Sequence, residues 1–144
     1  MREPVHTIDD YYDGPKQGIA DFEGKPHYYE REFDKEEDEY SRVFRLTSIS
    51  ESIFELAMEK WQIWCRWRKA FDSGKATISA HPALAEERPR YDELKRIVDE
   101  HIANSRTRSL RARAGFVFEP PKEGGGLENV HVEWARMGDG TPSP

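Results

Sequence analysis

Four residues close to the N-terminus carry side chains that could bind a divalent cation. They are His6, Asp9, Asp10 and Asp13. An imidazole and three carboxylates are suitable ligands for Mg²⁺, Mn²⁺ or Zn²⁺, and a bound metal could activate water in a small hydrolase or nuclease. The spacing does not favour this alternative, because His6 and Asp9 would point to opposite faces of a strand. A polar edge strand that enters a turn explains the same residues.

A second pattern of the nuclease type is the Glu-x-Lys triplet of Glu23 and Lys25. Cleavage with two metals needs carboxylates that share a cation and a lysine near the reacting groups. Gly24 lies inside the triplet and a proline follows it, so we expect a turn, where ligands are held less firmly than on a strand. His27 and His131 could act as general bases, but no serine or cysteine has a supporting context. The sequence therefore leans towards a protein without catalytic residues or a cofactor.

Four arginines and no acidic residue occur between residues 105 and 118. They are Arg106, Arg108, Arg111 and Arg113. On a strand, Arg111 and Arg113 would share one face, so contacts to nucleic-acid phosphates are geometrically possible. A sequence pI of about 5.4 opposes this alternative. The arginines could instead pair with Glu128 and Glu133, or with acidic residues of the segment 30–39.

The acidic excess of the chain lies entirely in its first third. The formal net charge is −6, and the segment 30–39 holds seven acidic and two basic residues. A tyrosine-rich group of aromatic residues falls in the same part of the chain. Its members are Tyr11, Tyr12, Phe22, Tyr28, Tyr29 and Tyr40. A short sheet cannot bury all these rings, and exposed tyrosines beside carboxylates make a suitable contact patch for a basic protein.

The leading hypothesis is a non-enzymatic protein-interaction module, such as an inhibitor, an immunity-type protein or an adaptor. The residues expected to contact the partner are Tyr11, Tyr12, Tyr28, Glu30, Glu32, Glu36, Glu37 and Asp38. Two competing interpretations stay open: the acidic run is a solvated loop, and the tyrosines pack on tryptophans from across the sheet. Glu30 and Glu32 would share a strand face as an acid–base pair or, more simply, as a solvated acidic face.

Composition indicates a folded chain. Of the 144 residues 36% are hydrophobic, and an aromatic share of 12% supplies large rings for a core. Cys65 is the only cysteine, so no internal disulfide can form, which fits a reducing compartment, by default the cytoplasm. The first residues lack an apolar signal segment and no run approaches 18 apolar residues, so we expect neither secretion by a signal peptide nor a membrane span.

A run of tryptophans gives the strongest prediction of secondary structure. Trp61, Trp64 and Trp67 recur at every third position and would cover about a third of the circumference of a helix. We expect this helix to begin after Thr47, with Ser48 as its cap, to end near residue 74, and to lie buried in the centre of the molecule. A second helix is expected from residue 89 to residue 104.

Alternating patterns predict strands on both sides of the helices. The expected strands cover residues 5–12, 18–22, 27–33 and 43–46 before the helices, and 110–118 and 130–134 after them. This order favours an α+β domain over residues 1–137, with an antiparallel sheet of five to six strands packed on a central helical hairpin. A small bent SH3-like barrel with a helical insertion is the alternative. The segment 138–144 is expected to be a disordered tail.

Overall fold

The computed structural model describes residues 2–11, 13–34, 39–119 and 129–137. The chain divides into two compact units, one formed by Met1–Ile49 together with Ser105–Pro144 and the other by Ser50–Asn104. The expected disordered tail over 138–144 falls outside the described residues. The expectation that the whole chain folds as one domain stays a prediction.

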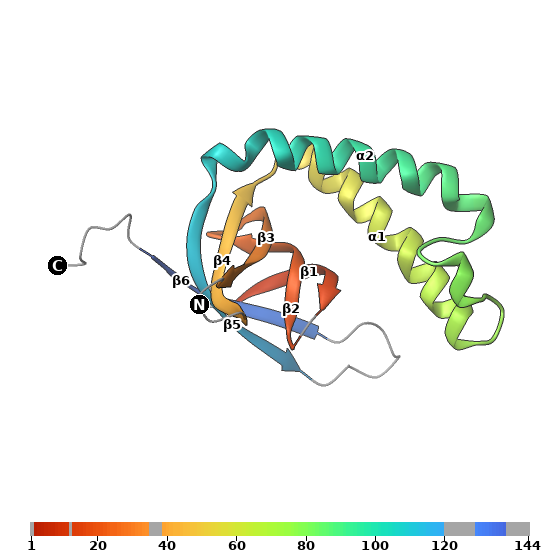
Figure 1. Cartoon of the computed structure of the whole chain (residues 1–144), viewed down its shortest axis with the longest axis horizontal. Coiled ribbons are helices and arrows are strands. Elements are labelled where there is room, and N and C mark those ends of the chain that lie inside the picture. Colours follow the sequence, from red (N-terminus) through yellow and green to blue (C-terminus); the bar gives the residue numbers. More distant parts are fainter. Residues whose placement is uncertain (1, 12, 35–38, 120–128, 138–144) are drawn as a thin grey trace. The chain divides into compact units, whose positions relative to one another are not determined.

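The described residues of the first unit form a closed barrel of six antiparallel strands (Figure 1). The strands are β1 (Arg2–Tyr11), β2 (Pro15–Phe22), β3 (Lys25–Asp34), β4 (Glu39–Ser48), β5 (Leu110–Glu119) and β6 (Asn129–Arg136). Each strand pairs with the next along the chain, and β1 closes the ring on β6, where Arg2 lies opposite Glu133. The predicted α+β class is confirmed, and the closed sheet agrees with the SH3-like alternative.

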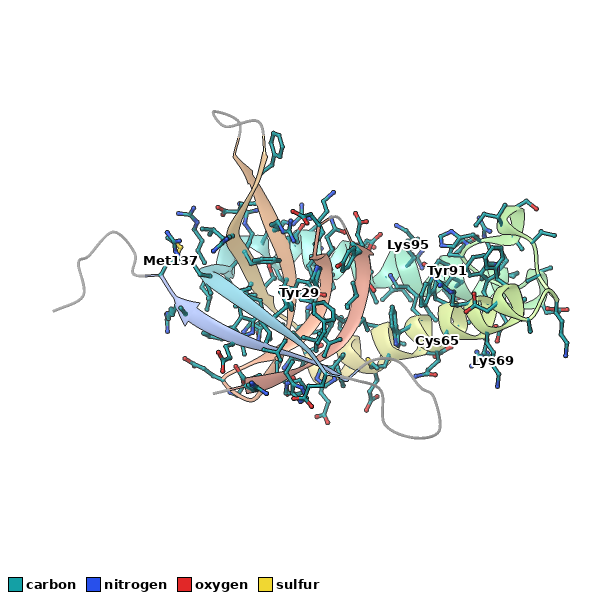
Figure 2. The ribbon with its side chains drawn as sticks, turned by 90° about the horizontal axis from the view of Figure 1, so that it is seen from below. Tyr29, Cys65, Lys69, Tyr91, Lys95 and Met137 are labelled. Atoms are coloured by element: carbon teal, nitrogen blue, oxygen red, sulfur yellow. The ribbon has the colours of Figure 1, made fainter. Side chains whose placement is uncertain are left out.

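Alternation along the strands fills the barrel with aromatic rings. Tyr29 is fully buried (Figure 2), and its ring centroid lies 5.9 Å from that of Phe44 and 6.3 Å from that of Trp134. Phe116 completes the cluster at 5.7 Å from Tyr29. The indole Nε1 of Trp134 donates a hydrogen bond of 2.9 Å to the carbonyl of Asp21. Tilted and edge-on rings at these distances attract one another beyond simple burial.

One glycine permits a close approach inside the barrel. The hydroxyl of Tyr29 donates to the carbonyl oxygen of Thr7 at 2.9 Å, and the backbone N–H of Ile19 donates to Thr7 Oγ1 at 2.9 Å. A Cβ at Gly18 would lie 2.2 Å from the carbonyl oxygen of Thr7 and 2.6 Å from the Tyr29 hydroxyl. Only glycine therefore fits where β2 passes this buried hydrogen bond.

Two helices dominate the second unit, α1 (Glu51–Asp72) and α2 (Arg88–Ser105), with short 3₁₀ turns η1 (Ile78–Ala80) and η2 (Ala85–Glu87) between them. Ser50 caps α1, because its hydroxyl accepts the N–H of Ile53 at 3.2 Å. The expectation that Ser48 is the cap is wrong. β4 continues to Ser48, and the N–H of Ile49 donates to the carbonyl of Pro26 at 3.3 Å, so the helix begins only after Ile49.

The predicted tryptophan helix is confirmed, and its indoles pack within the second unit. Trp61 and Trp67 are buried, whereas Trp64 is only half-buried and stacks on Trp61 at 4.9 Å. Arg90 of α2 holds the carboxylate of Glu59 on α1 through two hydrogen bonds of 2.6 and 2.8 Å. The indoles thus lie in the helical unit, and the barrel has an aromatic core of its own.

Candidate interaction surfaces

The candidate metal ligands on β1 make other contacts. His6 Nε2 lies 2.9 Å from the carboxylate of Asp21 on β2. Asp10 accepts the backbone N–H of Tyr11 at 2.9 Å and pairs with Lys16 at 3.4 Å, and Asp13 lies exposed in the turn with a positive φ of 51°. Within the described ranges, no group of three or more His, Cys, Asp or Glu side chains is arranged to hold a metal ion.

The Glu-x-Lys triplet lies in the turn between β2 and β3, as expected. Glu23 and Lys25 are both exposed, and the turn has positive φ values at Glu23 and Gly24. The carboxylate of Glu3 accepts the backbone N–H groups of Glu23 and Gly24 at 3.1 and 2.7 Å. The nearby Glu3 carboxylate therefore serves to close this turn.

The two candidate histidines and the cysteine are buried or half-buried. His27 is buried, its Nδ1 lies 2.8 Å from the carbonyl oxygen of Lys25, and its ring meets that of Phe22 edge-on at 5.4 Å. His131 is half-buried, with Nδ1 at 3.8 Å from Glu119. Cys65 is half-buried on α1 (Figure 2), where burial raises the pKa of its thiol. A raised pKa disfavours the reactive thiolate.

The aromatic residues of the first third divide between core and surface. Phe22 and Tyr29 line the barrel interior, because alternation on β2 and β3 turns them inward. Tyr29 contacts Trp134 there, as the interpretation that the tyrosines pack on tryptophans expects for this residue. Tyr28 is half-buried and donates to Gln17 Oε1 at 3.1 Å. Tyr12, Glu36, Glu37 and Asp38, and the side chain of Tyr40, fall outside the described part of the chain.

Tyr11 and Phe33 form what we call the aromatic rim. They are 60% and 46% exposed and lie near the ends of β1 and β3, which run in the same direction. Tyr11 lies opposite Pro15 of β2, and Arg31 on β3 donates to the carbonyl oxygen of Pro15 at 3.1 Å. One strand, β2, lies between β1 and β3 in the sheet. Carboxylates of Asp9, Asp10 and Asp13 are exposed on the same end.

Glu30 and Glu32 differ from the free acidic face that the sequence suggests. Glu30 binds Arg106 at 2.7 Å, and Glu32 binds Arg111 through two hydrogen bonds of 3.0 and 2.7 Å. The second carboxylate oxygen of Glu30 is buried and accepts no hydrogen bond from the described residues. These pairs follow the alternative in which the arginines meet the segment 30–39.

A further arginine on this face was missed by sequence reasoning. Arg45 is exposed on β4 and lies directly opposite both Glu30 and Arg111. Arg113 lies two residues beyond Arg111 on the same face of β5 and is also exposed. The period of two along the predicted strand was the available signal, because it places Arg45 on the same face as Val43 and Thr47.

The helical unit exposes its own apolar end. Ile78 is 67% exposed and Phe71 is 38% exposed, and Phe71 stacks on Trp67 at 5.1 Å. The indole of Trp67 donates to the carbonyl of Thr77 at 3.3 Å, which brings η1 beside the end of α1. Lys69 on α1 (Figure 2) is exposed near this end.

Neither described helix is long and apolar enough to cross a membrane. Comparisons of the chain with protein-family models, with curated proteins and with solved structures find no match. The surfaces described above are therefore the basis for any proposal about function.

Proposed function

We propose that this chain is a non-enzymatic protein-interaction module that contacts its partner through the aromatic rim. The exposure of Tyr11 and Phe33 at one end of the barrel carries the proposal. A single exposed apolar side chain is ordinary on a protein surface. Two exposed aromatic rings near the ends of β1 and β3 offer rigid contact area of the kind enriched at the centres of interfaces.

The charges around the rim support a partner with basic residues. Asp9, Asp10 and Asp13 bring three carboxylates to this end of the barrel, and the nearby cation Lys16 is paired with Asp10. We add these aspartates to the proposed contact surface because they are exposed, whereas Glu30 and Glu32 are half-buried and bound by arginines. Contacts from Tyr12, Glu36, Glu37 and Asp38 remain part of the proposal. Since the sole cysteine argues for a reducing compartment, we place the interaction in the cytoplasm.

Site-specific photocrosslinking tests the proposal. A benzophenone amino acid is placed at position 11 or 33, and at position 71 as a control, since Phe71 is an exposed aromatic residue of α1 in the helical unit. The labelled proteins are irradiated in an extract of the source cells. We expect the same discrete protein adduct from positions 11 and 33 and no such adduct from position 71.

Competition makes the test specific for the rim. An excess of unlabelled wild-type chain should abolish the adduct, whereas the Tyr11→Ser/Phe33→Ser variant should compete at least tenfold less well, because it lacks the two rings. Equal competition by the variant, or identical adducts from all three positions, would rule out the rim as the contact site.

A further inference from the structure

Charged side chains form a row across the outer face of the barrel. Glu30 on β3 lies opposite Arg45 on β4, and Arg45 lies opposite Arg111 on β5. Like charges directly opposite one another on antiparallel strands repel and lower stability. Opposite charges in such positions are favourable, so Glu30 is a stabilising neighbour of Arg45. Only the facing of Arg45 and Arg111 is left unexplained by the stability of the sheet.

The arginines outnumber the carboxylates that meet them. We define the arginine face as Arg45, Arg106, Arg111 and Arg113. Glu30 and Glu32 pair with Arg106 and Arg111, whereas Arg45 and Arg113 form no hydrogen bond or ion pair with any side chain that the structure describes. The face thus carries an excess of two positive charges, although the chain as a whole is acidic.

The pair between Glu32 and Arg111 holds an exposed guanidinium. Glu32 accepts hydrogen bonds from Nε and Nη2 of Arg111, and Nη1 donates to no residue that the structure describes. The Arg111 side chain is 56% exposed and that of Glu32 only 26% exposed. The carboxylate therefore fixes the orientation of a guanidinium that stays exposed to solvent.

We propose that the arginine face binds the phosphate backbone of a nucleic acid. Every cation of the face is an arginine, whose planar fork matches phosphate oxygens in pairs. Phosphates placed between Arg45, Arg111 and Arg113 would relieve the repulsion between facing arginines. Salt screens distant charges, so a ligand bound to this face interacts mainly with the nearby arginines and little with the acidic residues elsewhere in the chain.

The absence of an apolar anchor favours nucleic acid over an acidic protein. The large exposed apolar side chains of the described part of the chain are Tyr11, Phe33, Phe71, Ile78 and Phe118. None of them shares the outward positions of Arg45, Arg111 and Arg113 on β4 and β5, and Val43 beside Arg113 is buried. Protein interfaces need a buried apolar centre, whereas interfaces with nucleic acid are more polar and more positive.

Fluorescence anisotropy with the full chain tests this proposal. The probes are a labelled 20-nucleotide single-stranded DNA of mixed sequence and its duplex, titrated at several salt concentrations. Arg45→Ala/Arg113→Ala removes two exposed arginines without a described partner, so the variant should fold. Arg68→Ala/Arg96→Ala is the matched control, because it removes two exposed arginines of the helical unit.

We expect the wild type and the control to bind the preferred probe equally and the face variant to bind it at least tenfold more weakly. For the face variant with the single-stranded probe, the slope of log K against log salt concentration should be smaller in magnitude by about 1.4 than for the wild type. Each lost phosphate contact removes about 0.7 from this slope. Equal weakening by both variants, or no binding by the wild type, would overturn the proposal. Competition by polyglutamate as strong as that by unlabelled DNA would also overturn it and assign the face to a protein.

Discussion

The two units of the molecule use their arginines differently. In the helical unit every arginine is paired with a carboxylate, and these arginines are Arg66, Arg68, Arg88, Arg90 and Arg96. On the barrel, Arg45 and Arg113 have no such partner among the described residues, and Arg45 faces Arg111. The arginines of the helical unit thus have partners within the fold. The two arginines of the barrel without such partners are the ones that the proposal of phosphate binding uses.

The units also build their aromatic cores differently. In the barrel, Tyr29, Phe44, Phe116 and Trp134 come from four strands and meet only when the ring closes. In the helical unit, Trp61 stacks on Trp64 and Trp67 stacks on Phe71 along one helix. A core of distant residues depends on the whole ring, whereas stacked neighbours on a helix depend mainly on that helix.

Tyr29→Ala should have the largest effect on the barrel. Truncation of a buried aromatic residue leaves a cavity and costs about 3–5 kcal/mol, and here the hydrogen bond to the carbonyl of Thr7 is lost as well. Hydrogen exchange measured by mass spectrometry should show lost protection in β1 to β6 with protection in α1 and α2 retained. An equal loss in α1 would break the contrast between the units and support a single folding domain.

Removal of single indoles tests the helical unit. Trp67→Ala should lower the free energy of unfolding by about 3 kcal/mol, because Trp67 is buried and its Nε1 donates to the carbonyl of Thr77. Trp64→Ala should cost about 1–2 kcal/mol, since Trp64 is only half-buried and loses less contact area. Urea denaturation followed by circular dichroism measures both values. Equal losses would show that the stack works as one unit.

Tyr29→Phe isolates the hydroxyl in the barrel core. Burial, with smaller contributions from the charges of Asp9 and Tyr28, raises the pKa of Tyr29 well above its ordinary value of 10.0. The neutral form is therefore favoured in the fold, and this stability is present below pH 10.0 and is lost as the pH rises above it. At pH 8 the variant should be about 1 kcal/mol less stable than the wild type, because a buried hydrogen bond is missing.

Above pH 10 the stability difference between the wild type and Tyr29→Phe should become smaller, and the variant should then become the more stable protein. Only the wild type has to keep this phenol protonated in the folded state, at a cost of about 1.4 kcal/mol for each pH unit. Urea denaturation of both proteins between pH 8 and pH 11 measures the difference. A constant difference across this range would mean that Tyr29 ionises as easily in the fold as in the unfolded chain.

Local sequence patterns predict much of the fold but little of the candidate surfaces. Alternation along 110–118 correctly places Arg111 and Arg113 outside, and the spacing of Trp61, Trp64 and Trp67 predicts α1. The partners of these residues depend on strand register, which ring closure determines across residues far apart in the chain. For that reason the facing of Arg45 and Arg111 could not be predicted. The same holds for Tyr28 and Tyr29, which point to opposite faces of β3. The sequence alone could not predict which of the two faces the core.

The smallest stability effect is expected for Glu32→Gln, with Glu59→Gln as its counterpart in the helical unit. Each change removes a charge that pairs with an arginine on an exposed surface, so each should cost less than about 1 kcal/mol of unfolding free energy. The affinity for DNA should differ between the two variants. Glu32→Gln frees the fork of Arg111 and raises the charge of the arginine face, so binding should strengthen about two- to threefold, whereas Glu59→Gln should leave it unchanged.

Anisotropy at low salt, with the labelled strand used above, measures this difference. Weaker binding by Glu32→Gln would mean that the fixed orientation of Arg111 matters more than its free charge. Equal strengthening by both variants would show that only net charge acts, and the contrast between the paired arginines of the helical unit and the arginine face would then carry no functional meaning. Because the expected stability costs are matched, unfolding cannot account for either result.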